Sequence, residues 1–117
     1  MNSTTEVLSK EKIEAIVMAP GITAWKHYDV PNVSMAEVSF EPEAVEPLHY
    51  HEKAQQIFMV LEGEALFFVG DETLEVNAGE SLFVAPGIHH GAKNRGAGEL
   101  RIQVVSQPSA TGDRVDL

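Results

Sequence analysis

The sequence predicts an all-β domain, either a sandwich or a small antiparallel barrel. Short runs rich in apolar and β-branched residues recur along the chain, and Gly, Pro, Asn or Asp residues interrupt them about every eight to twelve positions. The sequence contains no repeat at solenoid spacing and no low-complexity tract. With 117 residues, the chain has room for one such domain and not for two.

The expected elements divide the chain into three parts. Residues 1–20 form an N-terminal extension, in which Ser9 is placed to cap a short helix over residues 10–17 until Pro20-Gly21 ends it. Residues 21–107 form the barrel, and residues 108–117 form a polar C-terminal tail. Within the barrel, we expect a strand that carries His49 and further strands at 22–28, 33–40, 55–61, 64–69, 73–76, 81–84 and 100–106.

The composition excludes several classes of partner. A net charge of -10 argues against nucleic acid and against anionic membrane surfaces, because both need basic patches. No apolar run is long enough to span a bilayer, and the first residues lack the basic start and apolar stretch of a secretory signal. There is no cysteine for a disulfide or a thiolate ligand. We therefore expect a cytoplasmic protein.

Two pairs of histidines are the most informative feature of the sequence. His49 and His51 are separated by one residue, so both side chains point to the same side of an extended strand. Two imidazoles this close are unfavourable when both are charged, but two neutral rings can share a metal ion. A second pair, His89-His90, follows the strand expected at 81–84 and the turn at Pro86-Gly87.

Together, these two stretches resemble the two conserved motifs of the cupin superfamily. The first family motif reads G-x5-H-x-H-x3-4-E-x6-G, and its last four marked positions correspond to His49, His51, Gln56 and Gly63. The second reads G-x5-P-x-G-x2-H-x3-N, and this chain matches it at Gly79, Gly87, His90 and Asn94. The chain departs from the motifs at Gln56, which replaces a glutamate, at Ala85, which precedes a proline shifted by one, and at the missing first glycine.

The resemblance implies a small single-domain cupin, an antiparallel jelly roll also called a double-stranded β-helix. It further implies that His49, His51, Gln56 and His90 face inward and bind one divalent metal ion. Three imidazoles and an amide oxygen suit a first-row ion, and ligand type alone leaves nickel, iron, manganese, zinc and copper open. His89 should point away from His90, and His27 lies far from both pairs, so we expect neither to be a ligand.

A glutamine in place of the usual glutamate favours one kind of chemistry. Four neutral ligands leave the full +2 charge on the metal, which favours polarisation of an anionic substrate oxygen over redox cycling. The ligand set resembles that of small cupin enzymes acting on uronate-derived sugars and of certain polyketide cyclases. We therefore expect an isomerase-like or cyclase-like enzyme acting on a small oxygen-rich carbonyl compound or sugar acid. A metal-dependent dioxygenase, a non-catalytic binding or sensor protein and a metal-free structural barrel remain alternatives.

The catalytic residues are not evident from the sequence. In the uronate-processing relatives an acidic residue on the last strand assists, and the corresponding position here is Gln103, which cannot act as a base. If the face of this strand that carries Arg101 and Gln103 looks into the pocket, Arg101 is a candidate anchor for a substrate carboxylate.

At the level of the fold we expect a homodimer, in which the N-terminal strands around Trp25 protect an unpaired edge or sheet face.

Overall fold

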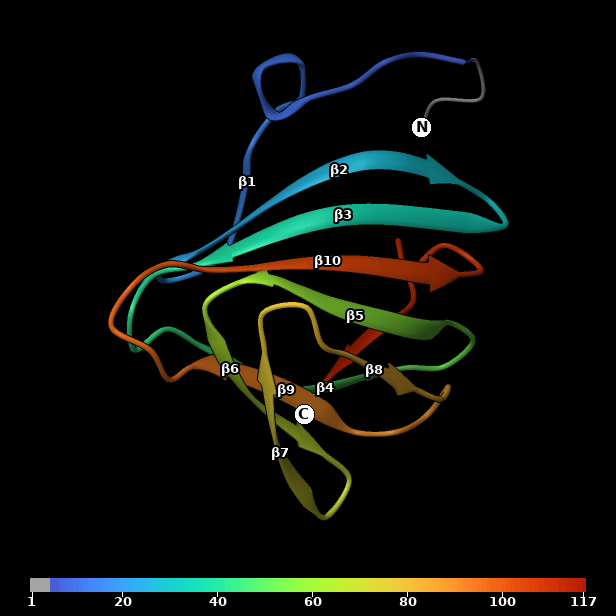
Figure 1. Cartoon of the computed structure of the whole chain (residues 1–117). Helices are drawn as coiled ribbons and strands as arrows, with labels where there is room; N and C mark the ends of the chain where they lie inside the picture. Colours follow the sequence, from blue (N-terminus) through green and yellow to red (C-terminus); the bar gives the residue numbers. More distant parts are fainter. Residues whose placement is uncertain (1–4) are drawn as a thin grey trace.

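The computed structural model describes residues 5–117. These residues form two antiparallel sheets that face each other, with β2, β3, β10 and β5 above β6, β9 and β4 in Figure 1. The described elements are a 3₁₀ helix, η1 (Lys10–Lys12), and the strands β1 (Ile16–Ala19), β2 (Ile22–Val30), β3 (Val33–Phe40), β4 (Val45–His51), β5 (Gln55–Glu62), β6 (Glu64–Val69), β7 (Glu72–Asn77), β8 (Ser81–Val84), β9 (His90–Asn94), β10 (Leu100–Gln107) and β11 (Arg114–Asp116). The all-β antiparallel prediction is confirmed.

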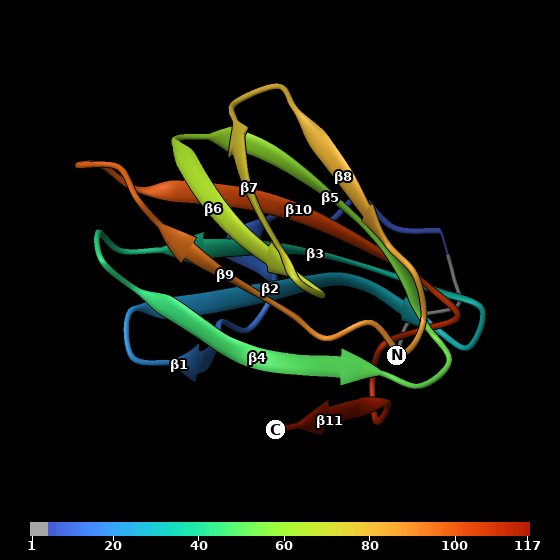
Figure 2. The same ribbon diagram turned by 90° about the horizontal axis from the view of Figure 1, so that it is seen from below.

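The order of the strands brings distant parts of the chain side by side. One sheet has six strands in the order β1-β2-β3-β10-β5-β8, and the other has five in the order β11-β4-β9-β6-β7. Figure 2 shows β11, from the C-terminal end of the chain, beside β4. We expected the N-terminal extension and the C-terminal tail to lie outside the barrel. Instead, the extension adds β1 to the six-stranded sheet and the tail adds β11 to the five-stranded sheet.

The helix expected over residues 10–17 is wrong beyond Lys12. Ser9 makes no side-chain cap to the 3₁₀ turn, and the chain is extended again at Ile13. The following residues form β1, in which Ile16 and Val17 pair with β2. Their branched side chains suit a strand better than a helix, and pairing with an existing sheet edge decides between the two. Among the described residues, no helix is long and apolar enough to cross a membrane.

Side chains that alternate between the two faces of each strand fill the space between the sheets. On β5, Phe58 and Val60 are buried while Ile57 points to solvent on the outer face. Phe58 packs against Phe67 of the opposite sheet with ring centroids 5.2 Å apart. The largest fully buried apolar side chains are Phe40, Phe67, Ile22, Leu100, Ile102 and Val60. These side chains form a core that holds the two sheets in a fixed arrangement beside the cavity described below.

Asn94, at the end of β9, ties together three backbone segments inside the protein. Its side chain is 0% exposed, and Nδ2 donates to the carbonyls of Phe40 at 3.0 Å and Gly98 at 2.8 Å. Its Oδ1 accepts a hydrogen bond from the Gly96 N–H at 2.9 Å. The amide thus satisfies three backbone groups, of which the carbonyl of Phe40 is buried.

We expect Asn94→Ala to lower the free energy of unfolding by about 3 kcal/mol or more, since it leaves buried backbone groups without partners. Urea unfolding followed by circular dichroism measures this loss. The matched control is Asn77→Ala, because Asn77 is exposed and accepts only a long side-chain bond of 3.4 Å from Arg95. The control should change stability by less than about 0.5 kcal/mol. An equal effect of both substitutions would contradict the structural role of Asn94.

Candidate metal centre and cavity

Neighbouring strands of the five-stranded sheet bring three histidines together on its inner face. His49 and His51 lie on β4, and His49 is paired directly with His90 of β9. All three side chains are buried, with exposed fractions of 3%, 6% and 2% for His49, His51 and His90. One nitrogen atom from each ring lies within 4.8 Å of the other two, so the three histidines could hold a metal ion.

Backbone carbonyl groups fix the orientation of two of the rings. Nδ1 of His49 is 3.0 Å from the carbonyl oxygen of Pro47, and Nδ1 of His90 is 2.9 Å from that of Ile88. A carbonyl oxygen can only accept, so in each neutral ring Nδ1 carries the proton and Nε2 carries the lone pair. Hydrogen bonds of this kind commonly orient histidine ligands of metals.

Gln56 is oriented by a neighbour on the same sheet. Its Nε2 donates to Oγ of Ser106 at 3.0 Å, which identifies the other amide atom, Oε1, as the free acceptor. Gln56 is buried and lines the same cavity as His49 and His51. The serine therefore fixes the amide so that its lone pairs are available on the cavity side.

Three buried polar atoms of this group have no hydrogen-bond partner among the described residues. They are His51 Nδ1, Gln56 Oε1 and His90 Nε2. Buried polar atoms without partners are rare, because each costs about 1–3 kcal/mol. No other buried side-chain nitrogen or oxygen in the described part of the chain is left in this state. A cation shared by these atoms would accept their lone pairs, so the residues fit a metal ion of the kind that binds nitrogen and oxygen ligands.

The histidines are held in the neutral form that metal binding requires. Burial is the largest of the causes that lower the pKa of His49 from 6.5 to about 4; the nearby His90 and Arg114 act in the same direction, and a hydrogen bond to Pro47 opposes them. Burial also lowers the pKa of His51 to about 4, with added repulsion from His49 and His90. The pKa of His90 is lowered by burial as well. At neutral pH all three rings are therefore uncharged.

A cavity of about 260 Å³ lies next to the histidines. Its walls come from both sheets, and apolar side chains such as Val38, Phe58 and Val104 supply much of them. The ionisable and amide side chains that line it are Lys26, Glu46, His49, His51, Gln56 and Arg114. With water occupying about 30 Å³, a cavity of this size has room for a small molecule of roughly ten non-hydrogen atoms.

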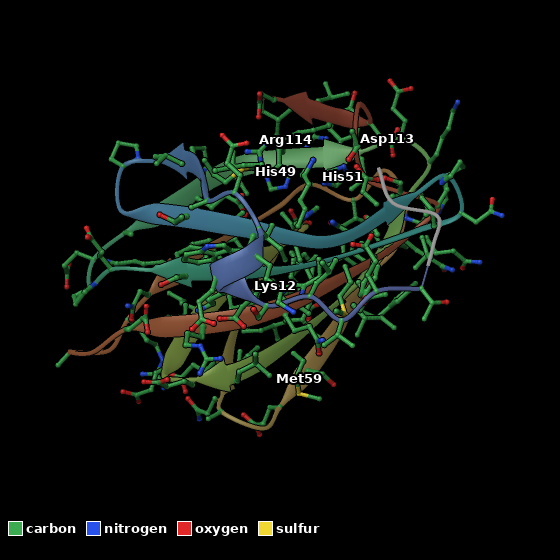
Figure 3. All side chains as sticks on the ribbon, turned by 90° about the horizontal axis from the view of Figure 1, so that it is seen from above. Lys12, His49, His51, Met59, Asp113 and Arg114 are labelled. Carbon is green, nitrogen blue, oxygen red and sulfur yellow. The ribbon has the colours of Figure 1, made fainter. Side chains whose placement is uncertain are left out.

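The sequence did not predict that three charged side chains line this cavity, namely Lys26, Glu46 and Arg114. Arg114 extends from β11 and donates from Nη1 to Oε2 of Glu46 at 3.1 Å. Lys26 of β2 donates from Nζ to Oγ1 of Thr111 at 3.0 Å. Figure 3 shows the segment carrying Asp113 and Arg114 above His49 and His51. The tail that we had set apart from the barrel thus forms one wall of the cavity, through residues 110–112 and Arg114.

Arg101 and Gln103 do not line this cavity, so the condition under which Arg101 was a candidate anchor for a substrate carboxylate is not met. Val104 and Ser106 of β10 line the cavity, and alternation places Arg101 and Gln103 on the outer face. Arg101 forms ion pairs there with Glu37 and Glu62. Gln103 donates to the sulfur atom of Met35 at 3.2 Å.

The other two histidines lie outside the group of three. His89 precedes β9, is exposed, and stacks on Tyr50 with ring centroids 5.1 Å apart. His27 is half-buried on β2 and does not belong to the group that could hold a metal ion. Both positions agree with the expectation that neither residue is a ligand.

Comparisons with known proteins agree with the fold. Residues 36–106 match the family described as cupin domain. An uncharacterized protein of Methanocaldococcus jannaschii is 30% identical over 84 residues, which are 67% of this chain and 67% of that protein. The structure of KdgF from Halomonas sp. superposes with a TM-score of 0.79 at 23% identity, covering 89% of this chain and 94% of that one. Oxalate oxidase in complex with glycolate gives a TM-score of 0.74 at 27% identity, where 86% of this chain spans 57% of the oxidase.

Proposed function

The chain belongs to the cupin family, and from this starting point we propose that His49, His51, Gln56 and His90 bind one divalent first-row transition metal ion. The observation that carries the proposal is the coincidence of three partnerless buried atoms, His51 Nδ1, Gln56 Oε1 and His90 Nε2, in one small region. A cation would satisfy all three at once. An ordered water molecule could satisfy only some of them, because it has two protons to donate.

We also propose that the bound ion serves an enzyme of the isomerase or cyclase type. With three imidazoles and one amide as ligands, it would keep its +2 charge and polarise a carbonyl or carboxylate oxygen of a small substrate. Gln56 in place of a glutamate supports this reading over the alternative of a dioxygenase. The apolar walls at Val38, Phe58 and Val104 would exclude bulk water from such a substrate.

Lys26 supports a sugar acid or another acidic carbonyl compound as the substrate. It lines the cavity and belongs to a strand of the sheet opposite the histidines. Its ammonium group is held by the hydroxyl of Thr111, which is itself bonded to Asp29. In this proposal Lys26 takes the place that the sequence had suggested for Arg101, as the anchor of a substrate carboxylate.

Metal analysis combined with turnover tests the proposal. Protein purified without chelator should contain about one equivalent of a first-row ion, and the loaded protein should consume a member of a panel of uronic acids and 2-oxo acids. Removal of the ion with a chelator should abolish this consumption. Binding without consumption would favour a non-catalytic binding protein. A content below about a tenth of an equivalent after reloading would contradict the metal site itself.

A homodimer remains a proposal, with a revised contact surface. The register places Ile57 beside Phe83 on the outer face of the six-stranded sheet, and these side chains are 50% and 55% exposed. Such an exposed apolar pair supports self-association through this face. Trp25, which we had expected to contribute, is covered by Lys10 of its own chain, whose Nζ lies 4.5 Å from the ring centroid.

A further inference from the structure

We propose that Glu46 is the catalytic carboxylate of this cavity, the group that takes a proton from the substrate carbon next to a carbonyl and returns one to it. The inference rests on the proposed function, since it assumes that the cavity binds a carbonyl compound beside a metal ion. It supplies the acid–base group that could not be identified from the sequence.

On a regular strand, Glu46 would point away from the histidines. It is three residues before His49, and side chains an odd number of positions apart lie on opposite faces. However, Glu46 pairs with Ala92 and His49 pairs with His90, so three steps along β4 correspond to two steps along β9. This register shift is a β-bulge at Pro47 and Leu48, both of which are exposed. The bulge turns Glu46 to the inner face, where it lines the cavity together with His49 and His51.

A glycine on the neighbouring strand makes room for the bulge. A Cβ atom at Gly91 would lie 2.7 Å from the carbonyl oxygen of Glu46 and 3.4 Å from the carbonyl carbon of Pro47. Contacts as short as 2.7 Å do not occur for real side chains, so a larger residue would push the bulge out of place. Glu46 therefore reaches the cavity through a backbone feature that two strands build together, which is typical of side chains aimed at functional sites.

The surroundings of Glu46 leave one of its oxygens available. Arg114 holds Oε2 at 3.1 Å, and no hydrogen bond to Oε1 is found among the described residues. Glu46 also lies outside the group of three histidines that could hold a metal ion, so it is not placed as a ligand. It borders both the main cavity and the small hollow beside His90. A positioned carboxylate next to the metal-binding group, but not part of it, has the geometry of a general base.

The proposed step is a reversible proton transfer without net oxidation or reduction. A C–H bond next to the substrate carbonyl breaks, and its proton forms an O–H bond with Oε1 of Glu46. The electron pair of the C–H bond forms a carbon–carbon double bond, while the π pair of the carbonyl moves to its oxygen to give an enolate. In the reverse direction Glu46 returns a proton to carbon, so an isomerisation or an exchange of hydrogen with solvent results.

Exchange of the methyl hydrogens of pyruvate in D₂O tests this step. Zinc-loaded protein should replace methyl hydrogen by deuterium faster than free zinc does, as followed by proton NMR. Glu46→Gln should lower this rate by about 100-fold or more, while zinc content and the affinity for pyruvate stay unchanged. Glu46→Asp, which retains the carboxylate, should exchange at an intermediate rate. Glu64→Gln is the matched control, since Glu64 is an exposed carboxylate paired with Arg95 at 3.5 Å and should leave the rate unchanged.

The outcomes separate the role of Glu46 from the proposed function. If Glu46→Gln exchanges at the wild-type rate, the role of Glu46 is wrong and the metal-dependent function stands. If the Gln variant loses zinc or pyruvate binding together with exchange, Glu46 holds the site in shape and does not transfer the proton, and the inference again fails. If the zinc-loaded wild-type protein shows no exchange above the background of free zinc, the proton transfer by Glu46 fails, whereas the proposed metal site is decided by the metal analysis described above.

Discussion

His90→Ala is expected to abolish metal binding while His89→Ala leaves it intact. The two residues are adjacent in the sequence, yet only His90 directs a buried nitrogen without a partner, Nε2, into the group of three histidines. His89 stacks on Tyr50 on the outside. Removing one of four ligands should weaken binding by more than the 10–100-fold typical of losing a group that only supports a ligand.

Isothermal titration calorimetry of the two chelator-treated variants with zinc measures this difference. Thermal unfolding without metal serves as the control for folding. Since His90 Nε2 has no hydrogen-bond partner among residues 5–117, its loss should change the stability of the metal-free protein far less than the stability of the loaded one. Equal zinc affinities for the two variants would contradict the assignment of His90 as a ligand.

Without metal, the protein should lose stability as the pH falls from about 6.5 to about 4. Burial lowers the pKa values of His49 and His51 to about 4, whereas in the unfolded chain they titrate near 6.5. Between these values the unfolded state binds more protons than the folded state, so acidification favours unfolding. Each pKa unit corresponds to about 1.4 kcal/mol, so a lowering from 6.5 to about 4 at both residues sets an upper bound of about 7 kcal/mol on this loss.

Urea unfolding of metal-free protein at several pH values between 7 and 4 tests this expectation. Carboxyl groups with lowered pKa values add a further loss of stability only below their usual pKa values. For Glu37 this begins at 4.5, near the acid end of the range, and for Asp29 at 3.8, outside it. Replacing His51 by Asn should reduce the slope between pH 6.5 and 4.5 without removing it, because the pKa values of His49 and His90 are lowered as well. A flat stability profile in the wild-type protein over this interval would refute the neutral, buried state of the histidines.

Strands and metal-binding candidates could be predicted from the sequence because both depend on local spacing. Strand periodicity placed His49 and His51 on one face, and the family motifs linked them to Gln56 and His90. The structure shows all four side chains buried and the three histidines together. The role of Gln56 as a ligand stays a proposal. Its orientation by Ser106 could not be predicted from the sequence, because the two residues are brought together only by the pairing of β5 and β10.

The charged side chains of the cavity could not be predicted in the same way, because they depend on pairing between distant strands. The bulge that turns Glu46 inward arises from the register between β4 and β9, and only Pro47 within the strand hinted at an irregularity. Arg114 reaches the cavity because β11 pairs with β4, which no local pattern in a short polar segment reveals. For a similar reason the sequence left the position of Arg101 open, since alternation defines two faces of β10 but not which of them turns inward.

The cavity wall at residues 110–112 is a loop, whereas the histidines stand on paired strands. Thr111 and Gly112 are exposed at their outer side, and a Cβ atom added to Gly112 would meet nothing within 4 Å, although its positive φ of 78° disfavours other residues there. Substitutions or insertions at Ala110 and Thr111 should therefore change the width of the cavity without altering the register between β4 and β9. Under the proposed function, substrate range and metal affinity would therefore be separable traits, which selection or engineering can adjust one at a time.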